Sequence, residues 1–534
     1  MIRLLLLMAV TVLAYRGLWA AGFVWDDIPL IVQNQALADW SIASIFGSDL
    51  WADSGAGEVA SGYYRPLVLL SFAFDRAVFG LNPLGFHVHS LIWHLLAVLG
   101  LYRLCRGMIG KDAAFVGACL FALHPAQSEV VSWIAARNDL MAAAFGFFAL
   151  GTVWGERSPS LWSWLGAMSL TVLSCLSKET AFVLPFLLLS ADIARKNKTG
   201  MWLRCGALAS GVLLVLCLRA YFGVGEAVVP SVEGWQLLMR SFVGWAGIMG
   251  STIVSPWPVS SARDLAWVPL VSPFRLCIGL AFWAVLGWVA YVAKGERRRV
   301  VLMGCAWLLV LLAITLVPTA DKGGFGDRFL YWPMAGLAVI VGTCCASHWK
   351  YMVPAIVVPA LLILHVRLPD WQHDRSLWGA AIRDVPTPTN ELSLGHALTL
   401  YSRHKRAHVN FVSAMGGQEV DWEACPPIVG SAMRSGLVRH AYRMGHWAIA
   451  RGCPKTGLMN GWMATAAAMN GDWEAAGSWA MSEPLDPKGR ARAVQAAIAR
   501  RAGDEAEYAE IEAEWIGERP LNVQVEALVR AGER

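Results

Sequence analysis

Apolar stretches separated by short polar segments fill the first two thirds of the chain. Such stretches are typical of helices that cross a membrane, because a straight crossing needs about 20 mostly apolar residues. Several are shorter, so we expect their helices to extend into the neighbouring sequence. The pattern predicts about eleven spans, at residues 2–21, 86–104, 113–123, 139–154, 161–176, 180–193, 202–222, 274–293, 300–317, 331–347 and 351–366.

Basic residues in the connecting segments predict which side of the membrane each segment faces. Short loops that are rich in Lys and Arg face the cytoplasm. One set of loops has this composition, around residues 103–111, 195–204 and 294–299. The long segment 22–85 contains only Arg65 and Arg76 as basic residues, so we expect it to face outward. If the apolar stretch 235–255 crossed, the cluster at 294–299 would lie outside, so we interpret this stretch as an interfacial or re-entrant helix.

The composition changes after the last span, where Ala, Glu, Arg and Trp replace the runs of Leu and Val. With the N-terminus inside and an odd number of spans, we expect this region on the outward side. Gly471 and Gly503 mark two similar turns about 32 residues apart, close to the roughly 34-residue period of tetratricopeptide repeats. We therefore predict an all-α membrane domain at 1–366 and an exported domain of tetratricopeptide-like helical hairpins at 367–534. Ordinary helical hairpins are the alternative for the second domain.

Composition agrees with a polytopic membrane protein and narrows the chemistry. The 534 residues are 56% hydrophobic and 16% charged, with a mean hydropathy of +0.48. The net charge of +5 comes largely from loop residues, and no basic stripe carries interleaved aromatics, so we expect no nucleic-acid partner. Most cysteines lie in or beside apolar stretches without the spacing of a zinc site. Cys425 and Cys453 lie in the polar region, where a disulfide is possible if that region is exported.

Two adjacent carboxylates, Asp26 and Asp27, follow the first apolar stretch. A carboxylate at the mouth of a hydrophobic helix is costly against lipid, so it more often faces water, a cavity or a partner. We interpret the pair as the centre of an outward-facing active site. A polar helix end that only stops membrane insertion is the alternative. The paired carboxylates could also bind a divalent cation, and the sequence indicates no other cofactor.

Candidate residues also lie in the outward segments, which we place at 22–85, 124–139, 223–272 and 318–330. Arg65 offers a planar, permanently charged group to a phosphate, although it could instead anchor its loop to lipid headgroups. Pro125 suits the first turn of a helix, so Glu129, Trp133 and Arg137 would share one helix face. An acid, an aromatic platform and a base suit a sugar and its phosphate. A salt-bridged amphipathic helix is the alternative.

Two further turns carry charges. Lys178 and Glu179 are neighbours, so they need not pair with each other and could reach separate partners, or they could form an ordinary solvated turn. Near the end of the membrane region, the glycines of segment 321–333 allow a close backbone approach. Arg328 then enters the next span at the depth of a lipid phosphate, which it could hold through two hydrogen bonds.

The order of these motifs resembles one known family. The matching segments are 23–27, 64–66, 79–83 with His87, 124–125 with Glu129 and 137–139, 178–180, and 327–333. They resemble the transmembrane-and-tetratricopeptide-repeat O-mannosyltransferases, which belong to the GT-C class of glycosyltransferases. The chain differs from the family pattern in three ways: Trp25 replaces a usual tyrosine, Asp327 replaces a usual glutamate, and the repeat region is shorter.

The resemblance implies a GT-C type helical bundle that catalyses an inverting transfer. The sugar, mannose-like, would pass from a polyprenyl-phosphate carrier in the bilayer to a protein hydroxyl or an envelope glycan outside. Asp27 or Asp26 would be the general base; Asp27 is our first choice, although the sequence does not separate the two. The donor phosphate would be held by Arg328, Arg137, Lys178 and Arg65. Supporting or positioning roles would belong to His124, Glu129, Trp133, Asp139 and Glu179.

Two other functions compete with a transferase. A transporter would also line a pathway with charges, but it usually carries them within its spans or in paired broken helices. A membrane-anchored scaffold would use only the exported hairpins, and it leaves the outward motifs unexplained. We favour the transferase, and the compact repeat region leads us to expect a bacterial inner membrane with the active site on the periplasmic side.

Overall fold

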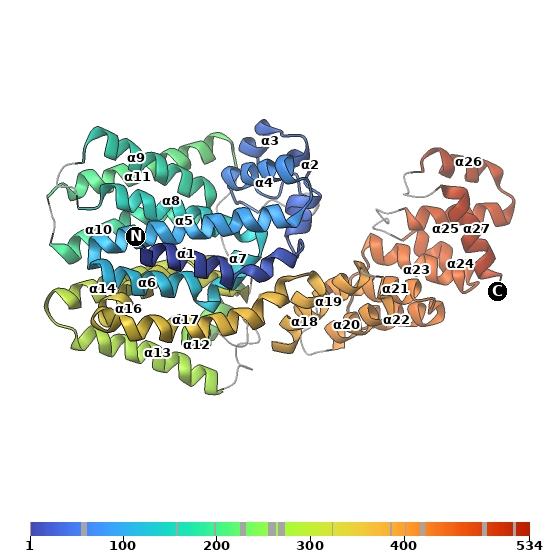
Figure 1. Cartoon of the computed structure of the whole chain (residues 1–534). Coiled ribbons are helices and arrows are strands. Elements are labelled where there is room, and N and C mark those ends of the chain that lie inside the picture. The colour runs from blue at the N-terminus through green and yellow to red at the C-terminus, as the bar shows by residue number, and fades with distance from the viewer. Residues whose placement is uncertain are drawn as a thin grey trace. The chain divides into compact units, whose positions relative to one another are not determined.

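The structure is a computed structural model of the whole chain. It describes residues 2–54, 61–155, 159–196, 199–224, 231–254, 263–264, 273–322, 324–384, 387–400, 402–416, 422–482, 489–515 and 520–533. Within the predicted outward segment 223–272, residues 225–230, 255–262 and 265–272 lie outside the described residues, as does Gly323. The chain divides into two compact units, Met1–Ala380 and Ala381–Arg534, and each is considered by itself (Figure 1).

The first unit is built from helices. Its α-helices are α1 (Ile2–Ala14), α2 (Gln35–Ala38), α3 (Ile42–Gly47), α4 (Pro66–Phe79), α5 (Pro83–Ile109), α6 (Lys111–Leu123), α7 (Ser128–Ser132), α8 (Arg137–Val153), α9 (Leu161–Ser177), α10 (Leu184–Arg195), α11 (Met201–Tyr221), α12 (Val232–Val254), α13 (Pro273–Val292), α14 (Gly295–Ile314), α15 (Leu316–Lys322), α16 (Pro333–Cys345), α17 (Trp349–Arg367) and α18 (Asp374–Asp384). Short helical turns join them, namely η1 (Arg16–Ala20), η2 (Ile28–Val32), η3 (Pro125–Gln127), η4 (Ile134–Ala136), η5 (Glu179–Val183), η7 (Asp327–Leu330), η8 (Ala346–His348) and η9 (Leu368–Trp371).

Several of these helices can cross a membrane. Among the described residues, seven helical stretches are long and apolar enough, and the bent pair Lys111–Leu123 with Pro125–Ser132 would make an eighth. The protein is therefore a polytopic membrane protein, as predicted. The count of about eleven is not confirmed. Three predicted windows form α8, α9 and α10, of 17, 17 and 12 residues, which are shorter than a straight crossing.

The stretch predicted as an interfacial or re-entrant helix is the unbroken 23-residue helix α12. A re-entrant hairpin needs a break, so the described helix does not support the re-entrant form. The helix is long and apolar enough to span, and an interfacial position stays a prediction. Glycines bring α12 close to α13: a Cβ atom on Gly250 would lie 2.6 Å from the carbonyl oxygen of Gly279. Small residues of this kind allow membrane helices to pack closely, where large side chains would separate them.

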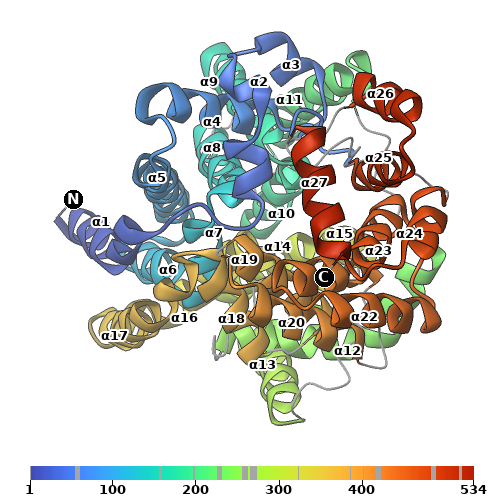
Figure 2. The same cartoon turned by 90° about the vertical axis from the view of Figure 1, so that its right-hand side faces the viewer.

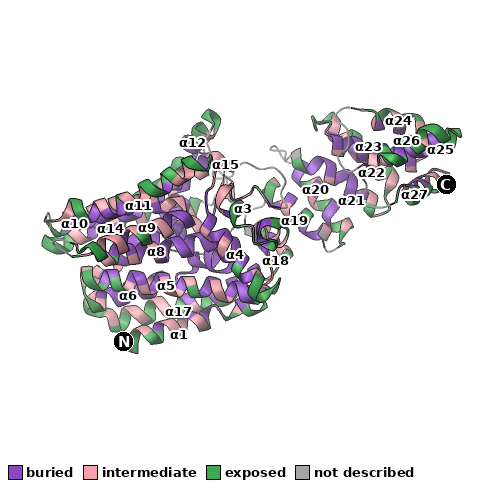
Figure 3. Ribbon diagram, turned by 90° about the horizontal axis from the view of Figure 1, so that it is seen from above, coloured by how far each residue is buried: buried purple, intermediate pink, exposed green. Residues whose placement is uncertain are grey.

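Burial separates helices of the core from helices at the periphery. Almost all of α8 is buried, whereas α13 buries only Gly279 and Leu286. Helices α1, α5, α6 and α17 run side by side in Figure 1 and are seen nearly end-on in Figure 2. Figure 3 shows buried residues along α5 and α8 and exposed ones along α1 and α17. The exposed residues of α1, α13 and α17 include large apolar side chains, as expected of surfaces that face lipid.

A short antiparallel strand pair joins two of the predicted outward segments. Strand β1 (Arg263–Asp264) pairs with β2 (Gly324–Phe325), with Arg263 opposite Phe325. Strand β2 directly precedes η7, which carries Arg328. The described part of segment 223–272 is therefore anchored to the loop that leads into this arginine.

The second unit consists of helical hairpins with one disulfide. Its helices are α19 (Pro388–Leu400), α20 (His404–Gly416), η10 (Trp422–Ala424), α21 (Cys425–Arg434), α22 (Val438–Ala450), α23 (Gly457–Met469), α24 (Trp473–Ala480), α25 (Arg490–Ala502), α26 (Glu505–Ala513) and α27 (Leu521–Gly532). Gly471 and Gly503 have positive φ at matching turns, where L residues with a side chain are rarely found. Each turn is followed by an aspartate that caps the next helix, so the two turns are built alike. A tetratricopeptide repeat stays a prediction.

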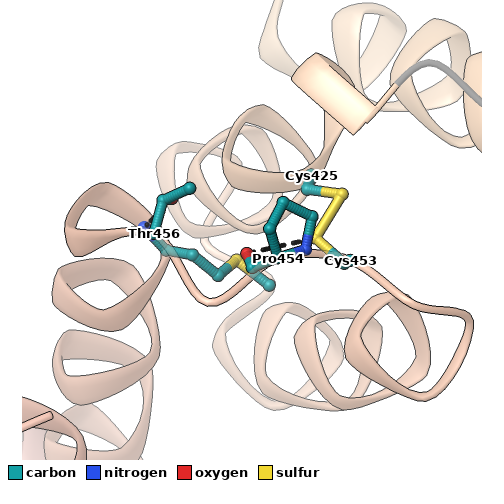
Figure 4. Close-up of a disulfide and its surroundings, with 5 residues drawn as sticks. Cys425, Cys453, Pro454 and Thr456 are labelled. Carbon is teal, nitrogen blue, oxygen red and sulfur yellow. Dashed lines mark hydrogen bonds between the residues drawn. A yellow bond between two sulfur atoms is a disulfide. The ribbon is translucent and has the colours of Figure 1, made fainter. Parts of the chain in front are cut away.

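Cys425, at the start of α21, forms a disulfide with Cys453, which follows α22 (Figure 4). The structure therefore contains the bond that the sequence left open. Both cysteines are buried in the apolar core of these hairpins. Thr456 then caps α23, because its side chain accepts a hydrogen bond from the N–H of Met459.

Candidate active site

The two aspartates of the predicted base lie in one turn between η1 and η2, but their surroundings differ. The Asp27 carboxylate is fully buried and accepts hydrogen bonds from two backbone N–H groups, Val24 at 3.0 Å and Ala135 at 2.7 Å. Burial raises the pKa of Asp27 well above its usual range, against the opposing effect of these two donors. Asp27 thus ties its turn to η4, and both of its oxygens are occupied.

Asp26, unlike Asp27, is partly exposed. Desolvation raises its pKa to about 7, Arg328 lowers it, and Asp374 raises it. A carboxylate with a pKa near neutrality can both accept a proton and lose it again at physiological pH. Of the two aspartates, Asp26 therefore has the access and the basicity that proton transfer needs.

Trp25, directly before Asp26, is held in an unusual backbone conformation. Its φ is +54°, in the left-handed region, which costs a residue with a side chain roughly 1–3 kcal/mol. The Trp25 N–H donates a 2.7 Å hydrogen bond to Asp374 Oδ1 at the start of α18. Trp378 packs its ring edge-on against the ring of Trp25, with centroids 5.3 Å apart. These contacts oppose the local backbone preference and keep Trp25 in place.

An aromatic pair and an arginine lie next to the aspartates. The rings of Trp25 and Trp133 are stacked, with centroids 4.4 Å apart and planes 10° apart. The guanidinium of Arg328 lies 5.4 Å from the centroid of each ring, within the range of a cation–π interaction. The Trp25 ring therefore covers a face of Trp133, which is only 6% exposed. The pyranose platform expected of Trp133 is covered in this structure.

Glu129 and Arg328 form the ion pair at the centre of this group. Arg328 Nη1 donates to Glu129 Oε1 at 2.7 Å, and the Arg328 N–H donates to Glu129 Oε2 at 3.2 Å. Glu129 is fully buried, whereas the Arg328 side chain is 22% exposed. Arg328 thus has one side fixed on Glu129 and another part of its surface accessible.

The predicted single helix from Pro125 to Arg137 does not form. Helix α7 ends at Ser132, Trp133 has an extended backbone, and a new helix begins at Arg137 after η4. The prediction that Glu129, Trp133 and Arg137 share one face is therefore wrong, because i, i+4 spacing aligns side chains only within a continuous helix.

Arg137 lies in a buried network instead of in the site. It is fully buried and forms a 2.6 Å ion pair with Asp75 Oδ2. Its guanidinium also donates to Ser90 Oγ at 3.1 Å and to the carbonyl oxygen of Phe86 at 2.8 Å. Asp75 is in contact with His89 as well. This arrangement holds α4, α5 and α8 together and leaves the guanidinium enclosed by protein.

A second pair of ion pairs lies around the start of η5. Lys178 donates to Asp139 Oδ2 at 2.6 Å, and Arg65 binds the Glu179 carboxylate through Nε and Nη2 at 3.1 and 2.8 Å. The neighbouring residues Lys178 and Glu179 thus reach separate partners, as the sequence analysis allowed. Burial lowers the pKa of Lys178, and Asp139 opposes this shift. The Arg65 and Lys178 side chains keep 10% and 15% exposure.

One short segment joins the two groups of charges. Ala135 N–H binds Asp27, and Asp139, four residues later, binds Lys178. Asn138 also donates to the Ala135 carbonyl oxygen at 3.2 Å. Only four positions of chain separate Ala135, in η4, from Asp139, in the first turn of α8. The structure therefore brings the aspartate turn and the Lys178 group to neighbouring positions.

His124 is engaged by backbone groups through both ring nitrogens. The Ala126 N–H donates to Nδ1 at 3.2 Å, so Nε2 carries the proton and donates to the Ile253 carbonyl oxygen at 2.9 Å. His124 therefore caps η3 and fastens α12, and the structure does not present it as a proton relay. Asp327 has a comparable role, because it binds Arg367 at 2.9 Å and so fastens η7 to α17.

The structure offers little support for a metal site at the aspartates. Among the described residues, no group of three or more His, Cys, Asp or Glu side chains is placed to bind a metal ion. Asp27, one of the two predicted ligands, already uses both oxygens for backbone N–H groups. Asp27 therefore has no carboxylate oxygen left for a cation that the two aspartates would share.

Known proteins resemble the chain over most of its length. Protein O-mannosyl-transferase TMTC3 of mouse is 23% identical over 477 residues, which cover 78% of this chain and 51% of that protein. Protein O-mannosyl-transferase F38B6.6 of Caenorhabditis elegans is 28% identical over 449 residues, covering 77% and 62%. The chain resembles the protein O-mannosyl-transferases. It spans about half the length of mouse TMTC3, and no family model matches it.

A third protein O-mannosyl-transferase has higher identity over a shorter region: mouse TMTC1 is 36% identical over 141 residues, or 26% of this chain and 15% of that protein. Two solved structures are also similar. ArnT from Cupriavidus metallidurans bound to undecaprenyl phosphate has a TM-score of 0.42 and 14% identity, over 88% of this chain and 80% of that chain. The Archaeoglobus fulgidus oligosaccharyltransferase has a TM-score of 0.34 and 14% identity, over 73% and 57%.

Sequence reasoning missed three residues around the site. Asp374 and Trp378 hold Trp25 from α18, and Asp75 neutralises Arg137. Asp374 is 349 residues from Trp25 in the sequence, so no local pattern connects them. For Asp75, the signal was an acidic residue in an otherwise apolar stretch, where a charge needs a partner.

Proposed function

We propose that the protein is an inverting glycosyltransferase that moves a mannose-like sugar from a polyprenyl-phosphate carrier to a hydroxyl group of a protein or an envelope glycan. The observation that carries the proposal is the position of Asp26, a partly exposed carboxylate with a pKa near 7, in the electrostatic field of Arg328. The names of the similar proteins support the class of reaction.

The proposed general base is Asp26. It would take the proton of the acceptor hydroxyl as the oxygen attacks the anomeric carbon and the bond to the carrier phosphate breaks. Asp27, whose oxygens are both bound by backbone N–H groups, would fix the turn that presents Asp26. This assignment reverses our first choice from the sequence.

The proposed donor-phosphate residues are Arg328, Lys178 and Arg65. All three side chains keep some exposure, and each is already oriented by a carboxylate. A cation held in place stabilises the charge that develops on the leaving phosphate without further rearrangement. Arg137, which is fully buried in its own network, would support the fold and not contact the donor.

The proposed location of the chemistry is the non-cytoplasmic face of the membrane. The positive-inside pattern supports it, and so does the Cys425–Cys453 disulfide, because disulfides persist mainly in oxidising compartments. An alkaline phosphatase fusion after Asp370 should be active, and an inactive fusion would reverse the orientation. A bacterial inner membrane stays a prediction, and the similar curated proteins named above are from mouse and nematode.

The decisive experiment is a transfer assay with purified protein. Radiolabelled polyprenyl-phosphate sugars are incubated with the protein and cell-envelope extract, and the label is followed into protein or glycan. We expect labelled acceptor with wild-type protein and about 10²- to 10⁴-fold less transfer with Asp26→Asn. Transfer that is equal in both proteins would contradict the assignment of the base, and no transfer from any polyprenyl-phosphate donor would contradict the proposed reaction.

A further inference from the structure

The start of α18 contacts the aspartate turn through two residues one helical turn apart. Asp374 accepts the 2.7 Å hydrogen bond from the Trp25 N–H, and Trp378 packs edge-on against the Trp25 ring at 5.3 Å and 76°. Residues at i and i+4 share a helix face, so both contacts come from one side of α18. We call Asp374 and Trp378 the α18 clamp.

The clamp acts on the residue where the backbone is strained. Trp25 has a φ of +54° and immediately precedes Asp26, so its backbone conformation sets the direction in which Asp26 leaves the turn. The ring of Trp25 is also held by Trp133, which is stacked on it with centroids 4.4 Å apart. Without the bond to Asp374, the part-buried Trp25 N–H would lose its partner, and an extended conformation would become competitive.

We propose that the α18 clamp is a positioning device that fixes Asp26 for proton transfer, and that Asp374 additionally strengthens Asp26 as a base through its negative charge. This inference rests on the proposed function for the role of Asp26. The positioning of Trp25 by α18 does not depend on the reaction, so it can be tested separately.

The charged groups around Asp26 determine the expected sign of the effect. They are Arg328 from η7 with its partner Glu129, the neighbouring Asp27, and Asp374 with the adjacent His373. Arg328 lowers the pKa of Asp26, whereas Asp374 raises it. Removing the charge of Asp374 should therefore move the titration of Asp26 to lower pH.

Two substitutions separate the charge of Asp374 from its hydrogen bond. Asp374→Asn keeps an oxygen that can accept from the Trp25 N–H but removes the charge. We expect it to shift the midpoint of the pH profile downward, because the pKa of Asp26 falls, and to lower the plateau kcat less than Asp374→Ala does, because the Trp25 contact is kept. Asp374→Ala removes both, so kcat should fall about tenfold or more, with an unchanged KM for the donor.

A spectroscopic measurement tests the positioning without any assay. Stacked indoles couple, so the circular-dichroism difference between wild-type protein and Trp133→Phe isolates the signal of the Trp25–Trp133 pair. We expect this signal to persist in Asp374→Asn and to weaken in Asp374→Ala and Trp378→Leu. Asp39→Asn, in an exposed part of the same outward segment, is the matched control and should change neither signal nor pH profile.

The clamp is overturned if Asp374→Ala and Trp378→Leu keep the wild-type indole signal and kcat. The charge effect is overturned if Asp374→Asn titrates at the wild-type midpoint. If wild-type protein transfers no sugar, the proposed function fails, whereas loss of the indole signal in Asp374→Ala would still support the clamp.

Discussion

The indole of Trp25 lies flat on the indole of Trp133, with centroids 4.4 Å apart, and Arg328 is 5.4 Å from both. Trp133 follows α7 and Trp25 follows η1, so the stack joins two of the segments that were predicted to face outward, directly beside the aspartates. Single substitutions in this group should therefore change transfer or stability in ways that can be measured separately.

Asp26 and Asp27 should respond differently to the same substitution. Asp26→Asn removes proton acceptance but little else, so transfer should fall by about 10²- to 10⁴-fold while the protein remains folded. In Asp27→Asn, an NH2 group replaces one carboxylate oxygen, so one of the two backbone N–H groups loses its acceptor. This loss costs roughly 1–3 kcal/mol of stability. Thermal unfolding in detergent and transfer rates at saturating donor and acceptor would separate the two effects. Near-normal turnover of Asp26→Asn would contradict the assignment of Asp26 as the base.

Transfer should depend on pH through Asp26. Because a general base acts only when it is deprotonated, kcat should be low at pH 5.5, rise through a midpoint near the pKa of about 7, and level off above it. An aspartate with its ordinary pKa would give a flat profile over this range. The control is a second measurement at pH 7 after exposure to each buffer, to exclude inactivation.

Replacement by lysine should affect the two arginines predicted at the donor site differently, lowering transfer at Arg328 and stability at Arg137. Arg328→Lys keeps the charge but loses the planar group, so transfer should fall substantially with stability nearly unchanged. Arg137→Lys cannot satisfy the same buried partners, and breaking such a pair costs about 3–5 kcal/mol. Unfolding temperature and apparent affinity for the lipid donor are the two measurements. A stable Arg137→Lys protein with weak donor binding would return Arg137 to the donor site.

The disulfide should stabilise the second unit. The bond closes a loop with a sequence separation of 28, and loss of such a link typically costs about 2–4 kcal/mol. We expect the double substitution Cys425→Ser, Cys453→Ser to lower the unfolding temperature of this unit. Cys217→Ser, at an exposed free cysteine, is the control. Thiol labelling of unfolded wild-type protein that modifies Cys425 without reduction would contradict the bond.

The sequence was enough to select Asp26 and Arg328 for the candidate site, but it did not predict most of the contacts between the residues there. Asp26 and Arg328 were recognisable because a charge at the edge of an apolar stretch is unusual. The pairing of Arg328 with Glu129 was not, since it depends on how η7 meets α7. The break at Trp133 was also missed, because the spacing of polar residues continues through it while the backbone does not.

The same limit applies to the membrane helices. Long apolar windows such as that of α5 predicted real helices, since periodicity and length agree there. The choice between a span and a shorter buried helix, as for α10, depends on which neighbours cover it. Close glycine contacts between other helices, such as that of Gly250 in α12 with Gly279 in α13, likewise join helices that the pattern of a single sequence does not pair.

The ion pairs of Arg328, Lys178 and Arg65 have a consequence for turnover. Each cation already faces a carboxylate at 2.6–2.8 Å, so the three pairs together carry no net charge. Under the proposed function, an arriving phosphate would not enter a strongly positive pocket but would share donors that carboxylates already use. Neutral pairs attract an anion over a shorter range than bare cations do. The spent carrier phosphate would then leave the site easily, and the carboxylates would reclaim their partners for the next donor.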